Sequence, residues 1–193
     1  MHRLTLLITL LLCGCTTVGK DVTANQKAVP SGRGIVVFST SADDISFAFP
    51  TKMILVEGES LKKYDKFVIF IDSKTTPSFS EQNTHVRSLT LKPGRYYLVP
   101  LPGNPAMRVV KTPVYTSSVN AGEIEYVGNV LLKTGSLLLS PNARDRDVRY
   151  FLERNPSLQG IDVKTRTMTV DRYISPDGDV RFDIKGIIWE APE

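Results

Sequence analysis

The sequence is poor in the residues from which disulfides, zinc sites and most catalytic triads are built. Its 193 residues contain two cysteines and two histidines, and both cysteines lie near the N-terminus, at Cys13 and Cys15. His2 lies in the same stretch, so His85 is the one histidine in the rest of the chain. A zinc site normally needs three or four His, Cys or carboxylate ligands, and the sequence shows no paired spacing of such residues. We therefore expect no disulfide framework, no metal site and no cofactor.

The sequence also lacks a long hydrophobic run. The stretch from Leu4 to Leu12 is far shorter than the ~20 apolar residues that cross a bilayer as a helix. It follows the short positive start Met1-His2-Arg3 and precedes Cys13-Gly14-Cys15. A positive start, a short apolar stretch and small residues are typical of a cleaved secretory signal. The N-terminus therefore predicts export rather than a permanent transmembrane helix.

The end of this signal resembles the bacterial lipobox. In Leu12-Cys13-Gly14-Cys15 a leucine stands three residues before a cysteine, although Cys13 is a less usual filler than Ser or Ala. The resemblance implies a signal peptide over residues 1–14, cleavage between Gly14 and Cys15, and a diacylglycerol on the Cys15 sulfur. Two or more acyl chains anchor a protein stably. Thr16, in place of Asp, favours the outer membrane where the organism has two membranes.

Charge excludes a further class of function. Removal of residues 1–14 takes Arg3 with it and leaves 179 residues with a net charge of +3. A dedicated nucleic-acid binder should show a concentrated basic face, so we expect no nucleic-acid partner. Four arginines do lie close together, but acidic residues are interleaved with them, and the pattern favours a solvated helix face over an anion site. The segment contains Arg144, Asp145, Arg146, Asp147, Arg149, Glu153 and Arg154.

Turn signals divide the rest of the chain into short β-type runs. The near-continuous apolar run 35–39 predicts a strand buried on both faces, and Lys92-Pro93-Gly94 suits a type II turn. Ala121-Gly122 and Thr134-Gly135 break the later runs. The fold class predicted is mainly β, an antiparallel β-sandwich of prealbumin- or Ig-like type with a C-terminal hairpin. The further strands are expected at 45–49, 53–56, 67–71, 89–91, 96–99, 109–115, 123–132, 136–139 and 163–173, with 180–184 and Trp189 after a turn at Pro176-Asp177-Gly178.

One segment has the period of a helix. Val148, Phe151 and Leu152 fall at i, i+3 and i+4 and predict a short helix over about residues 143–155. Asn142 is expected to cap its start, and Pro156 to end it. The full division is a signal peptide over 1–14, a flexible tether over 15–32 that lets the domain stand off the membrane, a β-domain with the helix over 33–158, and a β extension over 159–193.

Several of these motifs together are similar to a known family. Gly34-Ile-Val-Val-Phe, Leu91-Lys-Pro-Gly-Arg-Tyr-Tyr and Ala121-Gly-Glu-Ile-Glu-Tyr-Val-Gly-Asn-Val, followed by an arginine-rich helix, resemble uncharacterised bacterial lipoproteins with a prealbumin-like β-sandwich. The resemblance covers about residues 33–158. It implies the fold, and it carries no catalytic residues.

Candidate catalytic groups are few. Ser60-x-x-Lys63, Ser118-x-Asn120 and Lys133-Thr134-Gly135 occur in the order used by penicillin-interacting serine enzymes. Residues 59–66 are nearly all polar, whereas such a serine begins a buried helix, and the mature chain is too short for that fold. We interpret the Ser60 and Lys63 motif as coincidental. His85 is expected to be a solvent-facing strand residue rather than a catalytic base.

The remaining candidates are surface and core residues. Tyr96 and Tyr97 are neighbours on a strand, so one is expected in the core and the other exposed, where it could touch a ligand or partner. Trp189 is expected to fill the core. Acidic pairs could bind calcium but lack EF-hand spacing. They are Asp43 with Asp44, Glu57 with Glu59, and Asp177 with Asp179.

These observations support one leading function and two alternatives. The leading hypothesis is a membrane-anchored envelope lipoprotein whose domain is a non-enzymatic binding or structural module with an envelope protein as partner. The first alternative is an envelope hydrolase that uses Ser60, Ser118 or an unrecognised site. The second is a receptor for a small ligand or a metal ion. Cys15, as the lipidation site, is the one site residue that the sequence assigns.

Overall fold

The observed strands follow the runs that the turn signals separate. The computed structural model describes residues 19–21, 25–42, 51–57, 66–71, 76–101, 112–133, 136–140, 142–174, 181–183 and 188–190. The strands are β1 (Gly19–Asp21), β2 (Gly34–Ala42), β3 (Thr51–Glu57), β4 (Lys66–Ile71), β5 (His85–Leu91), β6 (Gly94–Leu101), β7 (Thr112–Val119), β8 (Ile124–Lys133), β9 (Ser136–Ser140), β10 (Val163–Thr165), β11 (Thr169–Ile174), β12 (Arg181–Asp183) and β13 (Ile188–Glu190). The described chain also contains the helix α1 (Arg144–Arg154) and two 3₁₀ helices, Glu81–Asn83 and Pro156–Leu158. The protein is mainly β, as predicted.

β2 lies at the centre of the first of two large sheets. All nine of its residues are buried, which confirms the strand predicted from the apolar run. The strand order is β1-β5-β2-β8-β10, with β9 paired to β8. β8 runs parallel to both β2 and β10. The prediction of antiparallel pairing was wrong here, because the chain passes through the second sheet between β2 and β8 and returns in the same direction, which a connection of this length permits.

The second large sheet is antiparallel, with the order β11-β7-β6-β3-β4. β5 and β6 flank Lys92-Pro93-Gly94 but belong to different sheets, so this segment carries the chain from one sheet to the other. A type II turn would need a φ near +80° at Gly94, and the observed φ is 157°. The predicted turn type was wrong, because the chain does not fold back on β5.

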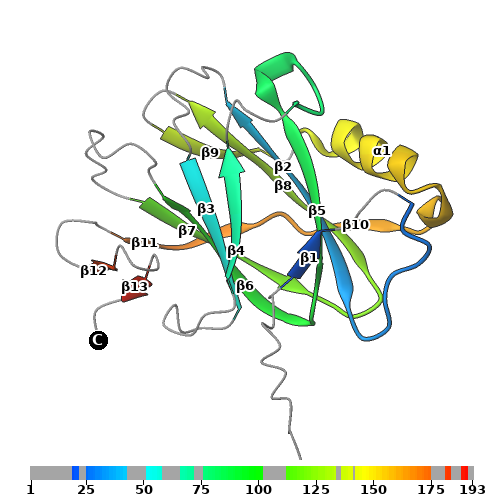
Figure 1. The fold of residues 1–193 in the computed structure, drawn as a ribbon, viewed down its shortest axis with the longest axis horizontal. Coiled ribbons are helices and arrows are strands. Elements are labelled where there is room, and N and C mark those ends of the chain that lie inside the picture. Colours follow the sequence, from blue (N-terminus) through cyan, green and yellow to red (C-terminus); the bar gives the residue numbers. More distant parts are fainter. Residues whose placement is uncertain are drawn as a thin grey trace, which may run out of the picture.

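An apolar cluster is formed by buried side chains of both large sheets, whose strands are labelled in Figure 1. Val36 and Phe38 of β2 face Tyr96 and Leu98 of β6 across it. Met168, in the segment that joins β10 to β11, packs into the same cluster. Burial of side chains of this size stabilises the folded state by roughly 1.5–3 kcal/mol each. The two sheets are therefore held together chiefly by this interior.

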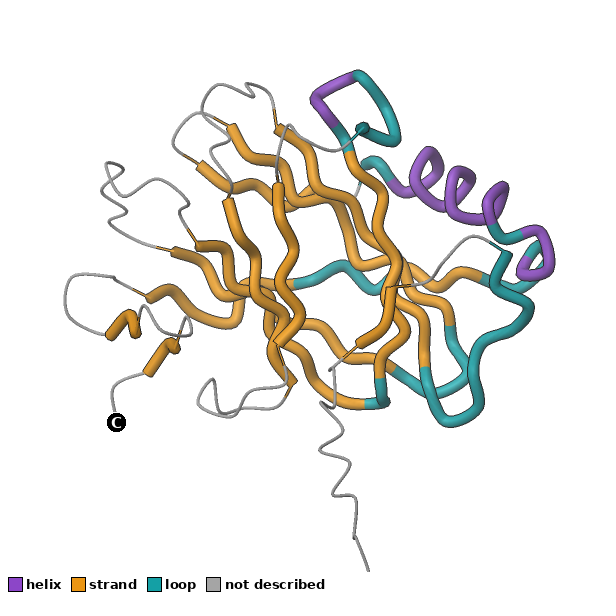
Figure 2. Tube along the Cα trace, in the orientation of Figure 1, coloured by secondary structure: helices purple, strands orange, loops and turns teal. Residues whose placement is uncertain are grey.

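A second apolar layer attaches α1 to the outer face of the first sheet. Val148 and Phe151 of α1 pack with Ile35, Val37 and other buried residues of that sheet. Figure 2 shows the helical segments gathered on one side of the strands. The layers are thus the second sheet, the first sheet and α1, in that order. The apolar stripe that predicted the helix is the face by which it packs.

The start of α1 differs from the prediction. The helix begins at Arg144 after Ala143, and no side chain caps its N-terminus. Asn142 lies one residue too early for capping, and its own backbone N–H donates to the hydroxyl of Ser140 at 3.3 Å. The predicted Asn142 cap was wrong. The helix does end before Pro156, where a 3₁₀ helix begins.

Segments on both sides of the predicted domain are joined to it. β1, inside the predicted tether, pairs with β5, and the N–H of Asn25 donates to the carbonyl of Arg154 at 2.8 Å. β10 and β11, inside the predicted extension, belong to the two large sheets. The structure therefore differs from the predicted boundaries at residues 32 and 158. These polar segments join through backbone hydrogen bonds, which any residue except proline can donate, so an apolar pattern does not reveal them.

Other predicted features lie outside the described residues. They are the signal peptide, Cys15, the strand at 45–49 and the turn at 176–178. β12 and β13 pair with each other, with Phe182 opposite Trp189. Within the part of the chain that the structure describes, no helix has the length and apolar character to cross a bilayer.

Candidate binding surface

A β-bulge at Gly128 decides which side chains of β8 face α1. Val37 pairs with Tyr126 and Ser39 pairs with Asn129, so three residues of β2 lie opposite four of β8. Gly128 takes up the extra residue with a φ of 116°, a conformation that costs glycine little. Tyr126 and Asn129 therefore both face the helix. Simple alternation would turn Asn129 toward the space between the sheets.

Beneath α1 the bulge creates a polar site around Asp147, whose side chain has no exposed surface. Oδ2 of Asp147 accepts hydrogen bonds from the hydroxyls of Ser39 and Tyr126, at 2.5 and 2.8 Å. Oδ1 accepts a bond from Nε of Arg146 at 2.9 Å, and Nη2 of the same guanidinium lies 2.8 Å away. A carboxylate removed from water is costly unless it is paired and hydrogen-bonded. Both oxygens meet that condition here.

The surroundings of Tyr126 keep its hydroxyl a donor. Burial, and secondly the charge of Asp147, raise the pKa of Tyr126 well above its usual value. The phenol therefore holds its proton throughout the physiological range.

A chain of hydrogen bonds runs from Asp147 to the end of the first sheet. The Asn129 amide donates to the hydroxyls of Ser39 and Ser41, at 2.6 and 2.8 Å. Ser41 lies 2.8 Å from the hydroxyl of Thr84, which donates to the carbonyl of Glu81 at 2.9 Å. Along this path the hydroxyls of Ser39, Ser41 and Thr84 each accept one bond and donate one, whereas the Asn129 amide donates two and Asp147 only accepts. We call Asp147, Ser39, Tyr126, Asn129, Ser41 and Thr84 the polar network.

Arg146 connects the polar network to the surface. Its guanidinium, held by Asp147, lies over the ring of Phe79 with Cζ 4.8 Å from the ring centroid. Phe79 makes an edge-to-face contact with Tyr150, with centroids 5.2 Å apart and an interplanar angle of 61°. Arg154 lies 5.6 Å over Tyr150 in turn. Cation–π contacts of this kind stabilise by about 0.5–1 kcal/mol at exposed sites.

Two hollows flank the exposed side of α1. One, of about 160 Å³, is lined by Phe79, Arg146, Arg149, Tyr150 and Glu153. The other, of about 450 Å³ and more open, reaches Gln159. Arg149 and Glu153 line both hollows. We call the five residues that line the smaller hollow, together with Arg154, the α1 surface.

Arg149 differs from Arg144 and Arg146, which are ion-paired, and from Arg154, which is also exposed but lies over the ring of Tyr150. The side chain of Arg149 is exposed, and within the described residues it has no ion-pair partner. Of the two hollows that it lines, the one of about 160 Å³ is smaller than the roughly 300–1,000 Å³ of small-molecule sites, and the one of about 450 Å³ is open to solvent rather than enclosed. Arginine and aromatic side chains are enriched in protein–protein interfaces. The arrangement suits a protruding side chain of a protein partner.

Comparison with models of known protein families, with curated proteins and with solved structures found no match. No residue role is carried over to this chain from a relative.

The residues of the arginine-rich segment, predicted from the sequence to form a solvated helix face, differ in burial and in their partners. Arg144 donates to the carbonyl of Val163 at 2.7 Å and to the hydroxyl of Thr165 at 2.6 Å. Asp147 is buried beneath the helix. The prediction was therefore wrong for Asp147, because a position four residues before Phe151 lies on the packed side. It holds for Arg149 and Glu153, which are exposed.

Two further predictions about single residues were wrong. His85 is 6% exposed rather than solvent-facing, because it pairs with buried Thr40 of β2 and follows the buried residues Asn83 and Thr84. Tyr96 and Tyr97 are both 2% exposed. Tyr97 lies on the outer face of the second sheet, where the guanidinium groups of Arg95 and Arg172 lie over its ring at 5.4 and 5.7 Å. The exposed tyrosine expected to meet a partner is thus covered.

The residues of the serine-enzyme pattern are only partly described. Ser118 is an exposed residue at the end of β7, and Asn120 donates to Glu123 and Glu125 at 2.9 and 3.2 Å. Ser60, Lys63, Thr134 and Gly135 lie outside the described residues, and of Lys133 only the backbone is described. The observed partners of Asn120 are carboxylates. The described side chains therefore place no part of the serine-enzyme pattern except Ser118 and Asn120.

Glu123 and Glu125 form a carboxylate pair at the edge between the two sheets. Arg166 lies 3.5 Å from Glu123 and 3.3 Å from Glu125, and Lys164 also bonds Glu123. The bond from Lys164, followed by that from Asn120, lowers the pKa of Glu123 to about 2. Burial, followed by the neighbouring Glu123, raises the pKa of Glu125. The two carboxyl groups thus titrate far apart.

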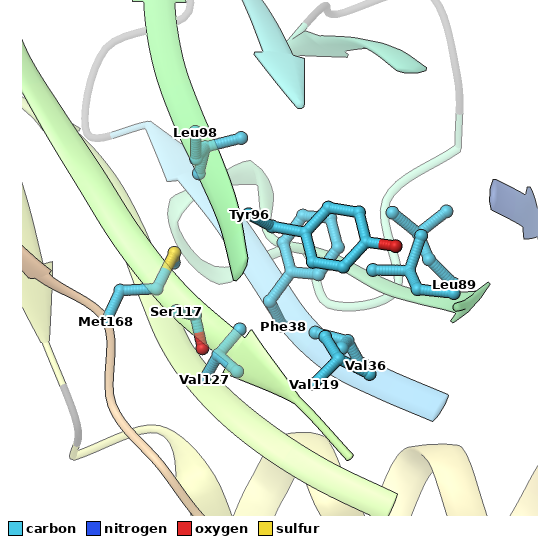
Figure 3. Close-up of a pocket in the computed structure, with 10 residues that line it drawn as sticks. Val36, Phe38, Leu89, Tyr96, Leu98, Ser117, Val119, Val127 and Met168 are labelled. Carbon is cyan, nitrogen blue, oxygen red and sulfur yellow. The ribbon is translucent and has the colours of Figure 1, made fainter. Parts of the chain in front are cut away.

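A small cavity lies inside the apolar cluster between the sheets (Figure 3). Its volume is about 30 Å³, enough for water-sized molecules only. Ser117 points into it among apolar neighbours such as Phe38, Tyr96 and Met168. This cavity does not fit a larger ligand.

The other predicted ligand groups are not placed by the structure. Asp43, Asp44, Glu59, Asp177 and Asp179 lie outside the described residues, and of Glu57 and Trp189 only the backbone is described. Among the residues that are described, no three His, Cys, Asp or Glu side chains come together as metal ligands.

Two residues of the candidate site were not predicted from the sequence: Asp147, which is buried beneath the α1 surface, and Phe79, which lies in it. A signal for Asp147 was present, because it precedes Phe151 by four residues and so shares the packed side of the helix. Ser39 and Ser41, polar at the end of an apolar strand, indicated that a polar group covers them. Phe79 stands in a Ser/Thr/Pro-rich stretch whose local pattern gives no such signal.

Proposed function

We propose that this protein is an envelope lipoprotein, anchored through a diacylglycerol on Cys15, whose domain is a non-enzymatic binding module. The support for the anchor is the sequence Leu12-Cys13-Gly14-Cys15 after an apolar stretch. Thr16 supports an outer-membrane location in a bacterium with two membranes. The support for a β-sandwich is the apolar cluster shared by two large sheets, and its prealbumin-like assignment belongs to the same proposal.

One observation carries the binding role. The α1 surface presents exposed Arg149 beside Phe79 and Tyr150, and Arg146 within it is fixed by buried Asp147. An interface residue held in place before binding loses less conformational entropy when a partner arrives. The polar network thus supplies rigidity, while Arg149 supplies a charge still open to a partner. We infer that the partner is an envelope protein that places an acidic side chain beside Arg149.

Neither alternative function gains an observation of this kind. A hydrolase would need a nucleophile beside a base, and Ser118 is placed beside no such group among the described side chains. A small-ligand receptor would need an enclosed site of several hundred Å³, whereas the described cavity between the sheets has about 30 Å³ and the hollow of about 450 Å³ beside α1 is open to solvent. The binding module is therefore the function that the described geometry supports best.

The experiment is site-specific photo-crosslinking in intact cells. A photoreactive amino acid at Arg149 is compared with the same amino acid at Thr169, an exposed residue of β11. We expect one reproducible protein captured from position 149 and absent from position 169. Equal capture at both positions, or none at either, would reject the α1 surface as the binding site.

The anchor needs its own experiment. Cys15→Ser should abolish incorporation of radiolabelled palmitate and release the protein from the membrane fraction. A matched Cys13→Ser variant should keep both properties, since Cys13 lies in the removed signal. A wild-type protein without fatty-acid label would refute the lipid anchor.

A further inference from the structure

β1 joins the first sheet at the end where β5 finishes and β2 begins. Gly19, its first residue, pairs with Leu91, and Leu91 also pairs with Gly34 at the start of β2. β1 is antiparallel to β5, so its N-terminus lies at the end of the sheet where β5 finishes. Figure 1 shows β1 beside that end of β5, away from the 3₁₀ turn at Glu81–Asn83. The chain before Gly19 therefore leaves from this end.

The chain between Gly19 and the proposed anchor at Cys15 is short. This inference rests on that anchor, which belongs to the proposed function. From Cys15 to Gly19 there are four residue steps, which span at most about 14 Å when fully extended. The headgroup layer of one leaflet is roughly 5–7 Å thick. The end of the sheet at Leu91 is thus kept within a short reach of the lipid, unlike a domain on the long tether that the sequence suggested.

Exposed turn residues lie at this end of the sheet. Lys92 and Pro93 are exposed between β5 and β6, and Ala121 and Gly122 are exposed between β7 and β8. The N–H of Gly122 donates to the carbonyl of Arg33 at 2.8 Å, which joins the β7–β8 turn to the start of β2. Neighbouring turns from both sheets thus meet in one surface.

The charges of this end favour an anionic surface. Lys92 and Arg33 have no ion-pair partner among the residues described, whereas the acidic Glu123 is bound by Lys164 and Arg166. Basic residues close to a bilayer are attracted to anionic headgroups within about a Debye length. Asp162, beside the start of β8, is an exposed acid there without a described ion-pair partner, so Lys92 and Arg33 together leave this end with net positive charge on the side that the lipid would hold near the membrane.

We propose that the lipid on Cys15 holds the domain end-on against a phospholipid bilayer, with the turns at 92–93 and 121–122 on the headgroups. The opposite end of the first sheet then points away from the membrane. The distance along β2 from Gly34 to Ser41 is about 23 Å. At this far end Ser41 is hydrogen-bonded to Thr84, which in turn donates to the carbonyl of Glu81. The α1 surface, which includes Phe79, is then accessible to a protein partner on the side away from the membrane.

Fluorescence quenching tests this orientation on the full lipidated protein. Its mature form has no cysteine except acylated Cys15, so Ala121→Cys and Glu81→Cys each introduce a single reactive thiol, both at exposed positions. Each variant is labelled and reconstituted in phosphatidylethanolamine–phosphatidylglycerol vesicles that carry a headgroup spin label. We expect several-fold stronger quenching at position 121 than at position 81. Equal quenching, or stronger quenching at 81, would overturn the orientation.

Two controls separate the possible failures. Palmitate labelling of the same preparations reports the anchor, so labelled protein with equal quenching refutes the orientation alone. Absence of palmitate refutes the anchor and this inference with it. Insertion of twelve Gly and Ser residues between Val18 and Gly19 should lower quenching at 121 toward that at 81. Quenching at 121 that is unchanged by the insertion would contradict the short connection as its cause.

Discussion

The two faces of β2 show how differently one strand can be packed. Toward the second sheet it presents Val36 and Phe38 to an apolar interior that contains a cavity of about 30 Å³. Toward α1 it presents Ile35 and Val37 to apolar residues, and then Ser39 and Ser41 to the polar network. The first face is stabilised by the area that it buries. The second is stabilised by bonds that each require a particular direction.

This difference assigns the two faces different tasks. Apolar contacts tolerate small shifts, because dispersion and burial depend little on orientation. Hydrogen bonds to a buried carboxylate do not, since a misplaced partner leaves a charge unsatisfied. The interior between the sheets therefore supplies most of the stability. The polar network fixes where α1 lies and, through Arg146, where Phe79 and Tyr150 lie.

The largest expected effect comes from breaking the apolar face. Phe38→Ala removes a ring that is 3% exposed in the inter-sheet cluster. It should lower the free energy of unfolding by about 4 kcal/mol, because the lost burial adds to the cost of the cavity left behind. Urea titration followed by circular dichroism measures the change. Phe38→Leu, which keeps most of the volume, should cost less than half as much. Equal losses in the two variants would show that the interior is not closely packed.

A smaller effect is expected from the polar face. Asp147→Asn keeps the shape of the side chain but removes the charge that meets Arg146 and two hydroxyl donors. We expect a loss of about 2 kcal/mol in the free energy of unfolding, within the range for a hydrogen-bonded buried charge. The near-ultraviolet spectrum of Tyr126 should change as well. Those two measurements report stability and local packing separately.

The matched control for Asp147 is two residues away. Asp145→Asn makes the same chemical change at a side chain that is 86% exposed. It should alter the free energy of unfolding by less than about 0.5 kcal/mol. A comparable loss for both variants would mean that Asp147 acts only through the helix dipole, which both residues share near the N-terminus of α1.

The sequence was sufficient for features that depend on local pattern. The apolar run at 35–39 and the stripe at Val148, Phe151 and Leu152 predicted β2 and α1, because burial on two faces and on one helical face leaves different periods. The sequence was insufficient to predict which strands pair with each other and in which direction. The parallel neighbours β2 and β8 are about 90 residues apart, and nothing in either segment records the direction of its neighbour. The same limit explains why β10 and β11 were predicted as an extension.

The candidate surface was harder to predict for a related reason. Alternating charges around Asp147 are typical of a solvated helix, and only the i, i+4 relation to Phe151 indicated burial. Asn129 faces Ser39 because of the bulge at Gly128, and a glycine in a strand is a weak signal of a bulge. Phe79 joins the surface through a segment distant in sequence. The parts of a site that come from tertiary pairing were not visible in local pattern.

The carboxylate pair offers a pH-dependent contrast between two neighbouring positions. An unfolded glutamate ionises near pH 4.5, and the pKa of Glu125 is raised in the folded protein by burial and then by Glu123. The unfolded chain therefore loses this proton first as pH rises. The free energy of unfolding should fall as pH rises from 4.5 through the raised pKa. Urea titrations between pH 4 and 8 measure this fall.

Glu125→Gln isolates this effect, because glutamine resembles the protonated acid and does not titrate. The variant should gain stability relative to wild type as pH rises, and the gain should vanish near pH 4. Glu123→Gln should behave oppositely. The pKa of Glu123 is lowered to about 2, first by Lys164, so its contribution is present above pH 4.5 and is lost as pH falls toward 2. Parallel pH profiles for the two variants would contradict the assignment.

The smallest expected effect on stability comes from Arg149, the residue that we propose as the main contact of the α1 surface with a partner. Arg149→Ala should change the free energy of unfolding by less than about 0.5 kcal/mol, because the side chain is exposed and has no ion-pair partner in the described chain. Arg144→Ala removes the same charge from the same helix but also the bonds to Val163 and Thr165, and it should cost about 1–2 kcal/mol. Partner capture by a photo-crosslinker at Glu153 should fall for Arg149→Ala. If capture is unchanged, or if both variants lose equal stability, Arg149 is not the contact that the α1 surface offers.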